Sequence, residues 1–207
     1  LTAEQQKTYR KLARAVALQD IPRLLENAKK TIRSQCYFEA ETAKETNQIL
    51  SCGLEIISAA SNCHKLHFNQ IKLKYPVTST RSVLWALADT ESNPFMDYYH
   101  ARLLPLIRER GYDFVGISVS GNSQLVSALT LAKLIKEQVP SVKHLTFGGN
   151  FITRILNNWS RPHVFFNYVD TFIRYEGECG LLALIQQLRS VGNFSTVPGL
   201  VFVEGNE

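Results

Sequence analysis

Small and polar residues follow three apolar segments in the second half of the chain, and their types suit the binding of a ligand. The stretches read SVSGNSQ, FGGN and YEGE. Glycine lets a backbone approach a bound molecule closely, and short hydroxyl and amide side chains offer hydrogen bonds to it. No paired nucleophile and base accompanies them, so we expect binding rather than catalysis, and no catalytic residue is predicted. The candidate binding residues are Ser118, Ser120, Gly121, Asn122, Ser123, Gln124, Gly148, Gly149, Asn150, Tyr175, Glu176, Gly177 and Glu178.

Each of the three stretches also has an explanation that involves no ligand. Asn122 or Ser123 can cap the helix that follows, although the unpaired N–H groups at that helix start also suit a phosphate or a neutral polar group. A glycine pair serves in any tight turn, and the helix dipole favours carboxylates at a helix start. One such stretch is weak evidence, whereas three at successive strand ends indicate the floor of one site.

The candidate residues lie in a region after Gly111 where apolar segments alternate regularly with helical patterns. Apolar segments cover residues 113–119, 142–147, 169–174 and 199–203, and helical patterns lie near 123–138, 151–158 and 178–190. Short apolar strands that alternate with amphipathic helices are typical of a parallel sheet with helices on both faces. Ligands bind such sheets at the carboxyl ends of the strands, where the three stretches lie. The sequence therefore predicts an α/β fold with a doubly wound, Rossmann-like or flavodoxin-like parallel sheet.

The part of the chain before this alternation reads as mostly helical. Helical patterns cover residues 3–19, 20–36 and 39–60, and a half-buried strand pattern covers 71–75. Ser79-Thr80 can cap a short helix that runs through Ala88. Asn93-Pro94 predicts the start of a further helix that ends near Gly111, with a kink at Pro105. We expect two domains, a helical N-terminal extension over residues 1–69 and the α/β domain over residues 70–207.

Several familiar sites are excluded by missing motifs. No GxGxxG follows a strand and no GxxxxGK[ST] is present, which argues against dinucleotide and P-loop sites. A receiver domain would have aspartates at strand ends, but Asp113 and Asp170 lie at strand starts. The five histidines include no HExxH pair, and no metal site is predicted.

Charge and apolar content bear on the surface of the protein and on its location in the cell. The net charge of +5 arises in residues 1–38, which hold eight Lys or Arg against three Asp or Glu. This excess suits a solvated helix face, or a surface for an acidic peptide, a nucleic acid or another part of a longer chain. The four cysteines form no CxxC and no disulfide framework, and we expect them to be buried as small apolar residues. No apolar stretch is long enough to span a membrane, and no basic segment with an apolar run opens the chain, so we expect a cytoplasmic protein.

Five stretches together resemble a known family in their order and spacing. They are NPFMDYY, DFVGISVSGNSQLVSALTLAKLIKE, HLTFGGN, VDTFIRYEGECGLLALIQQL and VPGLVFVEGN. This part of the chain, about residues 70 to 207, is similar to the cobalamin-binding domain at the N-terminus of many cobalamin-dependent radical S-adenosylmethionine enzymes. The helical N-terminal extension, residues 1–69, more loosely resembles that of a subgroup that includes enzymes modifying ribosomally made peptides.

The resemblance implies a function for the candidate residues. In this family the corrin lies over the carboxyl ends of the sheet, and its nucleotide tail reaches down between strands and helices. By resemblance, Ser118, Ser120 and residues 121–124 would meet the tail and the corrin edge. Residues 148–150 would let the tail pass, and residues 175–178 would complete the floor. The partners implied are cobalamin, a C-terminal radical S-adenosylmethionine barrel in cis and, for the peptide-modifying subgroup, a peptide substrate, with no nucleic acid and no membrane.

Two departures from cobalamin enzymes limit what the chain would do alone. The signature DxHxxG is absent, so cobalt would have no protein imidazole below it, as in many radical enzymes of this type. The CxxxCxxC that holds an iron–sulfur cluster is also absent, since the cysteines are separated by 16, 11 and 116 residues. The cluster and S-adenosylmethionine would then belong to a missing C-terminal domain that carries the methyl transfer or the peptide or natural-product modification. Leu1 in place of Met, and residues 204–207 directly after an apolar strand, fit such a cut chain, although the missing motif also fits a stand-alone or degenerate protein.

A second hypothesis places the chain in another functional class. It is an interaction module that keeps the fold, has lost the cofactor, and binds a partner protein or peptide through the basic N-terminal helices. A corrinoid absorption spectrum after reconstitution distinguishes the two hypotheses.

Overall fold

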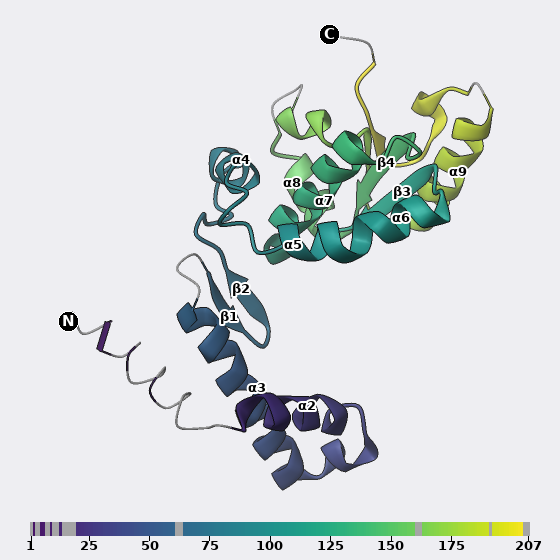
Figure 1. The fold of residues 1–207 in the computed structure, drawn as a ribbon. Coiled ribbons are helices and arrows are strands. Elements are labelled where there is room, and N and C mark those ends of the chain that lie inside the picture. The colour runs from purple at the N-terminus through teal and green to yellow at the C-terminus, as the bar shows by residue number, and fades with distance from the viewer. Residues whose placement is uncertain are drawn as a thin grey trace. The chain divides into compact units, whose positions relative to one another are not determined.

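The structure, a computed structural model, describes residues 2, 5–6, 9, 13, 20–60, 64–159, 163–190 and 192–204. The chain divides into two compact units, Leu1–Lys74 and Tyr75–Glu207 (Figure 1). Residues 70–74, which we expected to open the α/β domain, lie in the first unit. The helix predicted over residues 3–19 falls mostly outside the described residues.

In its described residues from 20 onward, the first unit contains two α-helices and a small hairpin. Helix α2 (Ile21–Thr31) is followed by a 3-10 turn (Gln35–Phe38) and by helix α3 (Ala40–Ala60), and strands β1 (Lys65–His67) and β2 (Gln70–Lys72) pair antiparallel. Gly53 lets α2 and α3 pack closely, because a Cβ there would lie 2.5 Å from a methyl of Leu25. The Ser58 hydroxyl accepts a hydrogen bond of 2.7 Å from the Leu66 N–H and so joins α3 to the hairpin. Both predicted helices are confirmed, whereas β1 was not foreseen and β2 ends before Leu73.

The second unit is built on a sheet whose described strands follow the order β3-β4-β5-β6. Their bounds are β3 (Phe114–Ser118), β4 (His144–Gly148), β5 (Thr171–Ile173) and β6 (Leu200–Val201). All four segments predicted as strands contain one. The first three are parallel, and the α/β class is confirmed. The strand order does not reverse within this sheet, so the doubly wound arrangement is not confirmed.

The last strand departs from the prediction because β6 is antiparallel to β5. After helix α9 (Gly177–Arg189), a 3-10 turn (Phe194–Thr196) and Gly199 return the chain to the carboxyl end of β5. Gly199 has a φ of +69°, and its carbonyl oxygen accepts a hydrogen bond of 2.9 Å from the Arg174 N–H. The chain therefore enters β6 from the end at which β5 finishes.

The helices before β3 begin and end near the predicted positions. Helix α4 (Thr80–Ala88) is capped by the Ser79 hydroxyl, as predicted. Helix α5 (Met96–Tyr98), a π-helical turn (Tyr99–Leu103) and helix α6 (Leu104–Arg110) form one continuous helical run that ends at Gly111, which has a φ of +62° (Figure 1). The π-helical turn ends at Leu103, two residues before Pro105. Because proline has no N–H to donate to the preceding turn, the hydrogen-bond pattern must change there.

Helices cover both faces of the sheet. Phe172 packs edge-on against Trp159 and Phe166, which follow helix α8 (Asn150–Leu156). Ile173 points to the opposite face, because side chains alternate along a strand, and packs with Leu184 of α9. Helix α7 (Leu125–Gln138) connects β3 to β4 and contacts α4 and α6.

The core of the second unit lies between these layers. Its fully buried side chains include Phe147, Phe172, Leu104, Leu129, Leu145, Ile152 and Leu184. Polar contacts fix the helical run to α7: the Asn93 side-chain amide donates to the Thr130 hydroxyl at 2.8 Å, and the Tyr99 hydroxyl donates to the Ser127 carbonyl oxygen at 3.2 Å. None of the helices in the described ranges is long and apolar enough to cross a membrane.

Candidate functional site

A cavity of about 430 Å³ lies at the carboxyl ends of β3, β4 and β5, beside the start of α9. Its volume falls within the range of small-molecule sites in proteins. The cavity is on the Ile173 face of the sheet, where α9 packs over β5 while Gly116 and Ser118 of β3 remain exposed. The lining residues are Gly116, Ile117, Ser118, Thr146, Gly148, Gly149, Ile173, Tyr175, Glu176, Gly177, Glu178 and Leu181.

At three of the glycine positions in this lining, the fold does not require glycine. A Cβ on Gly116, Gly148 or Gly177 would meet its nearest neighbour at 3.6, 3.6 or 3.7 Å, which is ordinary contact. None of the three has a positive φ. The missing side chains therefore leave space over the sheet that the fold itself does not need. Such a cradle allows a ligand to lie directly on the backbone.

Gly149 and Gly180 differ from these three because the fold requires them. Gly149 has a φ of +100°, and a Cβ on it would lie 2.7 Å from the Val119 carbonyl oxygen. A Cβ on Gly180 would lie 2.6 Å from the Pro198 carbonyl oxygen. Gly149 thus lets β4 turn into α8 against the end of β3, and Gly180 lets the chain before β6 cross α9.

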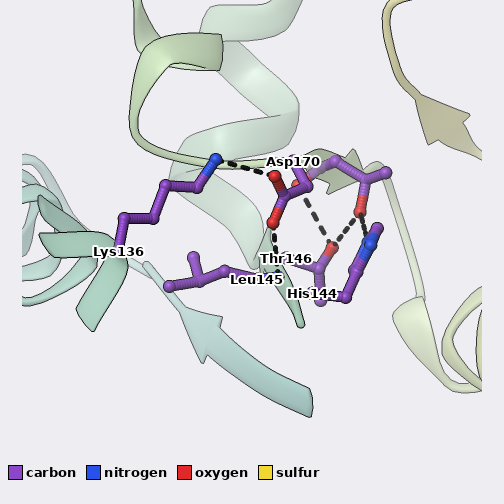
Figure 2. A network of polar contacts seen from close by, with 6 residues as sticks. Lys136, His144, Leu145, Thr146 and Asp170 are labelled. Atoms are coloured by element: carbon purple, nitrogen blue, oxygen red, sulfur yellow. Dashed lines mark hydrogen bonds and ion pairs between the residues drawn. The ribbon is translucent and has the colours of Figure 1, made fainter. Parts of the chain in front are cut away.

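Thr146 contributes a methyl group to the floor of the cavity. Its Cγ2 lies 3.6 Å from the place of a Cβ on Gly116. Its hydroxyl donates to the Thr171 carbonyl oxygen at 3.2 Å and accepts from the Thr171 hydroxyl at 2.9 Å (Figure 2). Hydrogen bonds between β4 and β5 therefore hold the hydroxyl on the β5 side, and the methyl faces Gly116.

His144 completes this network at the other end of β4. Its Nε2 lies 2.9 Å from the Thr171 hydroxyl oxygen (Figure 2). Because the Thr171 hydroxyl donates to Thr146, Nε2 must carry the proton and donate to Thr171. Burial lowers the pKa of His144 below its ordinary value of 6.5, while nearby Asp170 raises the pKa less strongly. The neutral imidazole is the form that fits this buried place.

Asp170 fixes the amino ends of β4 and β5. One carboxylate oxygen accepts from the Leu145 N–H at 2.7 Å, and the other forms an ion pair of 2.7 Å with Lys136 of α7 (Figure 2). Both side chains are one third exposed. Asp170 lies at the opposite end of β5 from the cavity and acts as a structural residue.

The mouth of the cavity is formed by the turn between β5 and α9. Tyr175 has a φ of +64°, an unusual value for a residue with a side chain, and its N–H donates to the Thr153 hydroxyl at 2.8 Å. Glu176 and Glu178 are exposed and line the cavity. Strained backbone of this kind is found often at ligand sites.

The loop after β3 contributes less to the cavity than we expected. The Gln124 side-chain oxygen accepts from the N–H groups of Ser120 and Gly121 at 2.7 and 3.2 Å. The loop thus caps its own helix, and two of its N–H groups, those of Ser120 and Gly121, are already engaged within the loop. Ser120, Gly121, Asn122, Ser123 and Gln124 lie outside the cavity lining, and so does Asn150, the first residue of α8.

Seven predicted residues meet in the lining: Ser118, Gly148, Gly149, Tyr175, Glu176, Gly177 and Glu178. Sequence reasoning missed five others: Gly116, Ile117, Thr146, Ile173 and Leu181. A glycine inside a strand, such as Gly116, is a known signal of close backbone approach and was the available clue.

Metal ligands are not gathered in the part of the chain that the structure describes. No group of three or more His, Cys, Asp or Glu side chains there is placed to hold a metal ion. No histidine is among the described residues that line the cavity.

Comparison with known proteins gives no further assignment. No protein family, no curated protein and no solved structure matches this chain.

Proposed function

We propose that this chain is the cobalamin-binding module of a larger radical S-adenosylmethionine enzyme, and that the cavity receives the nucleotide tail of the cofactor. The observation that supports this best is the set of glycines Gly116, Gly148 and Gly177, which share one cavity and have no structural requirement for glycine. A large ligand that spreads across several strand ends needs small residues at each of them.

The cavity suits one part of the cofactor, its nucleotide tail. A cavity of about 430 Å³ accommodates a tail but does not enclose a whole corrinoid. The three glycines would let the tail lie on the backbone, and Ser118 would offer a hydroxyl to it. Because no histidine is among the lining residues described, cobalt would have no imidazole from the cavity. In the full enzyme the bound cofactor would supply methyl transfer chemistry.

The rest of the proposal concerns the larger protein. A C-terminal barrel would hold the iron–sulfur cluster and S-adenosylmethionine and act on a peptide or another natural product in the cytoplasm. The finer fold assignment, a doubly wound Rossmann-like or flavodoxin-like sheet, belongs to this proposal too. Its support is that the described sheet is mostly parallel and has helices on both faces.

Titration with hydroxocobalamin followed by gel filtration tests the proposal. We expect a change in the corrinoid spectrum and cofactor that stays with the protein. Gly148→Val fills the cavity and should weaken binding at least about 10-fold, because branched side chains would take the place of the ligand. Gly121→Val is the matched control, since its backbone is extended, its Cβ site is open and it lies outside the lining. Wild-type protein that shows no spectral change and retains no cofactor would rule the proposal out.

A second candidate function is a cofactor-free interaction module. Lys30 and Arg33 are exposed beside exposed Ile32, and Phe38 is 84% exposed. Arg23 and Lys29 form ion pairs with Asp20 and Glu26, but within the described ranges neither Lys30 nor Arg33 forms one. This mixed basic and apolar surface suits an acidic amphipathic peptide. Retention of such a peptide by protein that does not bind hydroxocobalamin would favour this function.

A further inference from the structure

The cavity is apolar inside and acidic at its mouth. Besides the Ser118 hydroxyl, its inner surface includes Gly116, Gly148, the Thr146 methyl, Ile173 and Leu181. This surface offers no charged group, and the Thr146 hydroxyl is engaged with Thr171. The part of a ligand that enters the cavity is therefore expected to be apolar and thin enough to lie against the strand backbone.

The mouth offers acceptors that have no cationic partner. Glu176 and Glu178 line it, and no described residue forms an ion pair or a side-chain hydrogen bond with either carboxylate. No lysine or arginine is among the lining residues described. The adjacent cation, Arg174, lies over the Tyr175 ring at 5.8 Å and is not part of the lining.

From this arrangement we infer that the cavity selects a ligand with a flat apolar body and an outer end that donates hydrogen bonds or carries positive charge. Glu176 and Glu178 would be the residues that determine this specificity. Ionised carboxylates only accept hydrogen bonds, and charge-assisted bonds are stronger than neutral ones. A ligand with a carboxylate at its outer end would instead meet two like charges. The inference rests on the proposed function only in that both require a ligand in this cavity, and it does not depend on a corrinoid. If the ligand is the nucleotide tail, its anionic phosphate must lie away from Glu176 and Glu178.

Three probes with the same ring test the inference directly: benzamidine, benzamide and benzoate. We expect methyl resonances of Ile173 and Leu181 to shift on titration, with benzamidine binding at least about 10-fold more tightly than benzoate and benzamide lying between them. Gly148→Val should abolish the shifts for all three probes, because it fills the floor. These titrations use the isotope-labelled chain without cofactor.

The carboxylates are tested by substitution with a matched control. The double substitution Glu176→Gln with Glu178→Gln should reduce the preference for benzamidine over benzoate to about 2-fold or less, since the exposed charges are then gone. Glu109→Gln with Glu137→Gln makes the same change in net charge on α6 and α7, outside the cavity, and should leave the preference intact. Equal binding of benzamidine and benzoate, no binding of any probe, or a preference that survives the first pair of substitutions would overturn the inference.

The outcomes for the two proposals are distinguishable. Hydroxocobalamin binding without a probe preference overturns only the inference on specificity. A probe preference without hydroxocobalamin binding supports that inference and overturns the cobalamin proposal.

Discussion

A Cβ atom on Gly149 would lie 2.7 Å from the carbonyl oxygen of Val119. Gly149 also has a φ of +100°, whereas a Cβ on its neighbour Gly148 would meet nothing closer than 3.6 Å. We therefore expect Gly149→Ala to reduce the free energy of unfolding by about 2–4 kcal/mol, from strain and displaced backbone. Gly148→Ala should change it by less than about 1 kcal/mol, because alanine suits a strand at least as well as glycine.

Urea unfolding of the two variants measures this difference. Similar losses of stability would show that the fold also requires Gly148. Only Gly116 and Gly177 would then remain as lining glycines that the fold does not require. The same alanine at position 148 occupies only part of the cavity, so it also serves as the milder partner of Gly148→Val in binding experiments.

Gln124 should act as a helix cap and not as a ligand contact. Its side chain accepts from two backbone N–H groups, those of Ser120 and Gly121. Gln124→Ala is expected to cost about 1 kcal/mol of stability, the usual value for a lost cap. Hydroxocobalamin affinity should not change. Gln186→Ala, on the exposed surface of α9, is the control for removing a glutamine side chain, and a loss of affinity in Gln124→Ala alone would return the first loop to the site.

Asp170 should matter for stability mainly through its hydrogen bond to the Leu145 N–H. Asp170→Ala leaves that N–H without its partner, and we expect a loss of about 2 kcal/mol. Asp170→Asn keeps an acceptor oxygen and should lose less. Lys136→Met removes only a partly exposed ion pair, for which a loss of about 1 kcal/mol or less is expected. Chemical unfolding of the three variants tests this order, and a Lys136→Met loss as large as that of Asp170→Ala would contradict it.

The free energy of unfolding should decrease as the pH is lowered through the range where histidine titrates. Burial lowers the pKa of His144 below 6.5 in the folded state. As the pH falls, the unfolded chain therefore takes up a proton first, and its free energy drops relative to the folded state. The contribution of His144 is complete above pH 6.5 and is lost as the pH falls through 6.5 toward the folded-state pKa. His163, whose pKa is also lowered by burial, adds to the same trend.

Urea midpoints at pH 7.5 and 5.5 measure this trend. His144→Gln keeps a side-chain amide that can donate to Thr171, and it should lose less stability on acidification than the wild type. His100→Gln, at an exposed position of the helical run, serves as the control. An unchanged pH dependence in His144→Gln would mean that its protonation is not linked to unfolding.

The strands and most of the helices were predictable because their signals are local. The apolar segment over residues 113–119 marked β3, and Ser79 marked the start of α4. The direction of β6 was not predictable, because it depends on Gly199 and on a hydrogen bond from Arg174, which is distant in sequence. Strand β1 and its pairing with β2 were missed because each of the two strands has only three residues.

The candidate site was predictable only where it coincides with strand ends. Gly148 and Glu176 follow strands, and the carboxyl ends of parallel strands meet at one edge. Gly116 and Thr146 lie inside strands, and their role depends on which part of the sheet α9 leaves uncovered. No local pattern shows this. The role of residues 120–124 as ligand contacts stays a prediction. The sequence does not show that Gln124 takes the N–H groups of Ser120 and Gly121 or that the loop lies outside this lining.

Tyr175 provides a test of whether the mouth of the cavity stores strain. Its φ of +64° is accessible to glycine at no cost but costs a residue with a Cβ about 1–2 kcal/mol. Tyr175→Gly should therefore be more stable than Tyr175→Ala by about 1 kcal/mol, although glycine is normally the less stable of the two. Tyr112 is an exposed tyrosine without a positive φ, and there we expect the ordinary order, with the alanine variant more stable. Thermal melts of the four variants give the comparison directly. If alanine is preferred at both positions, Tyr175 is not strained in solution, and the positive φ loses its value as a sign of a ligand site.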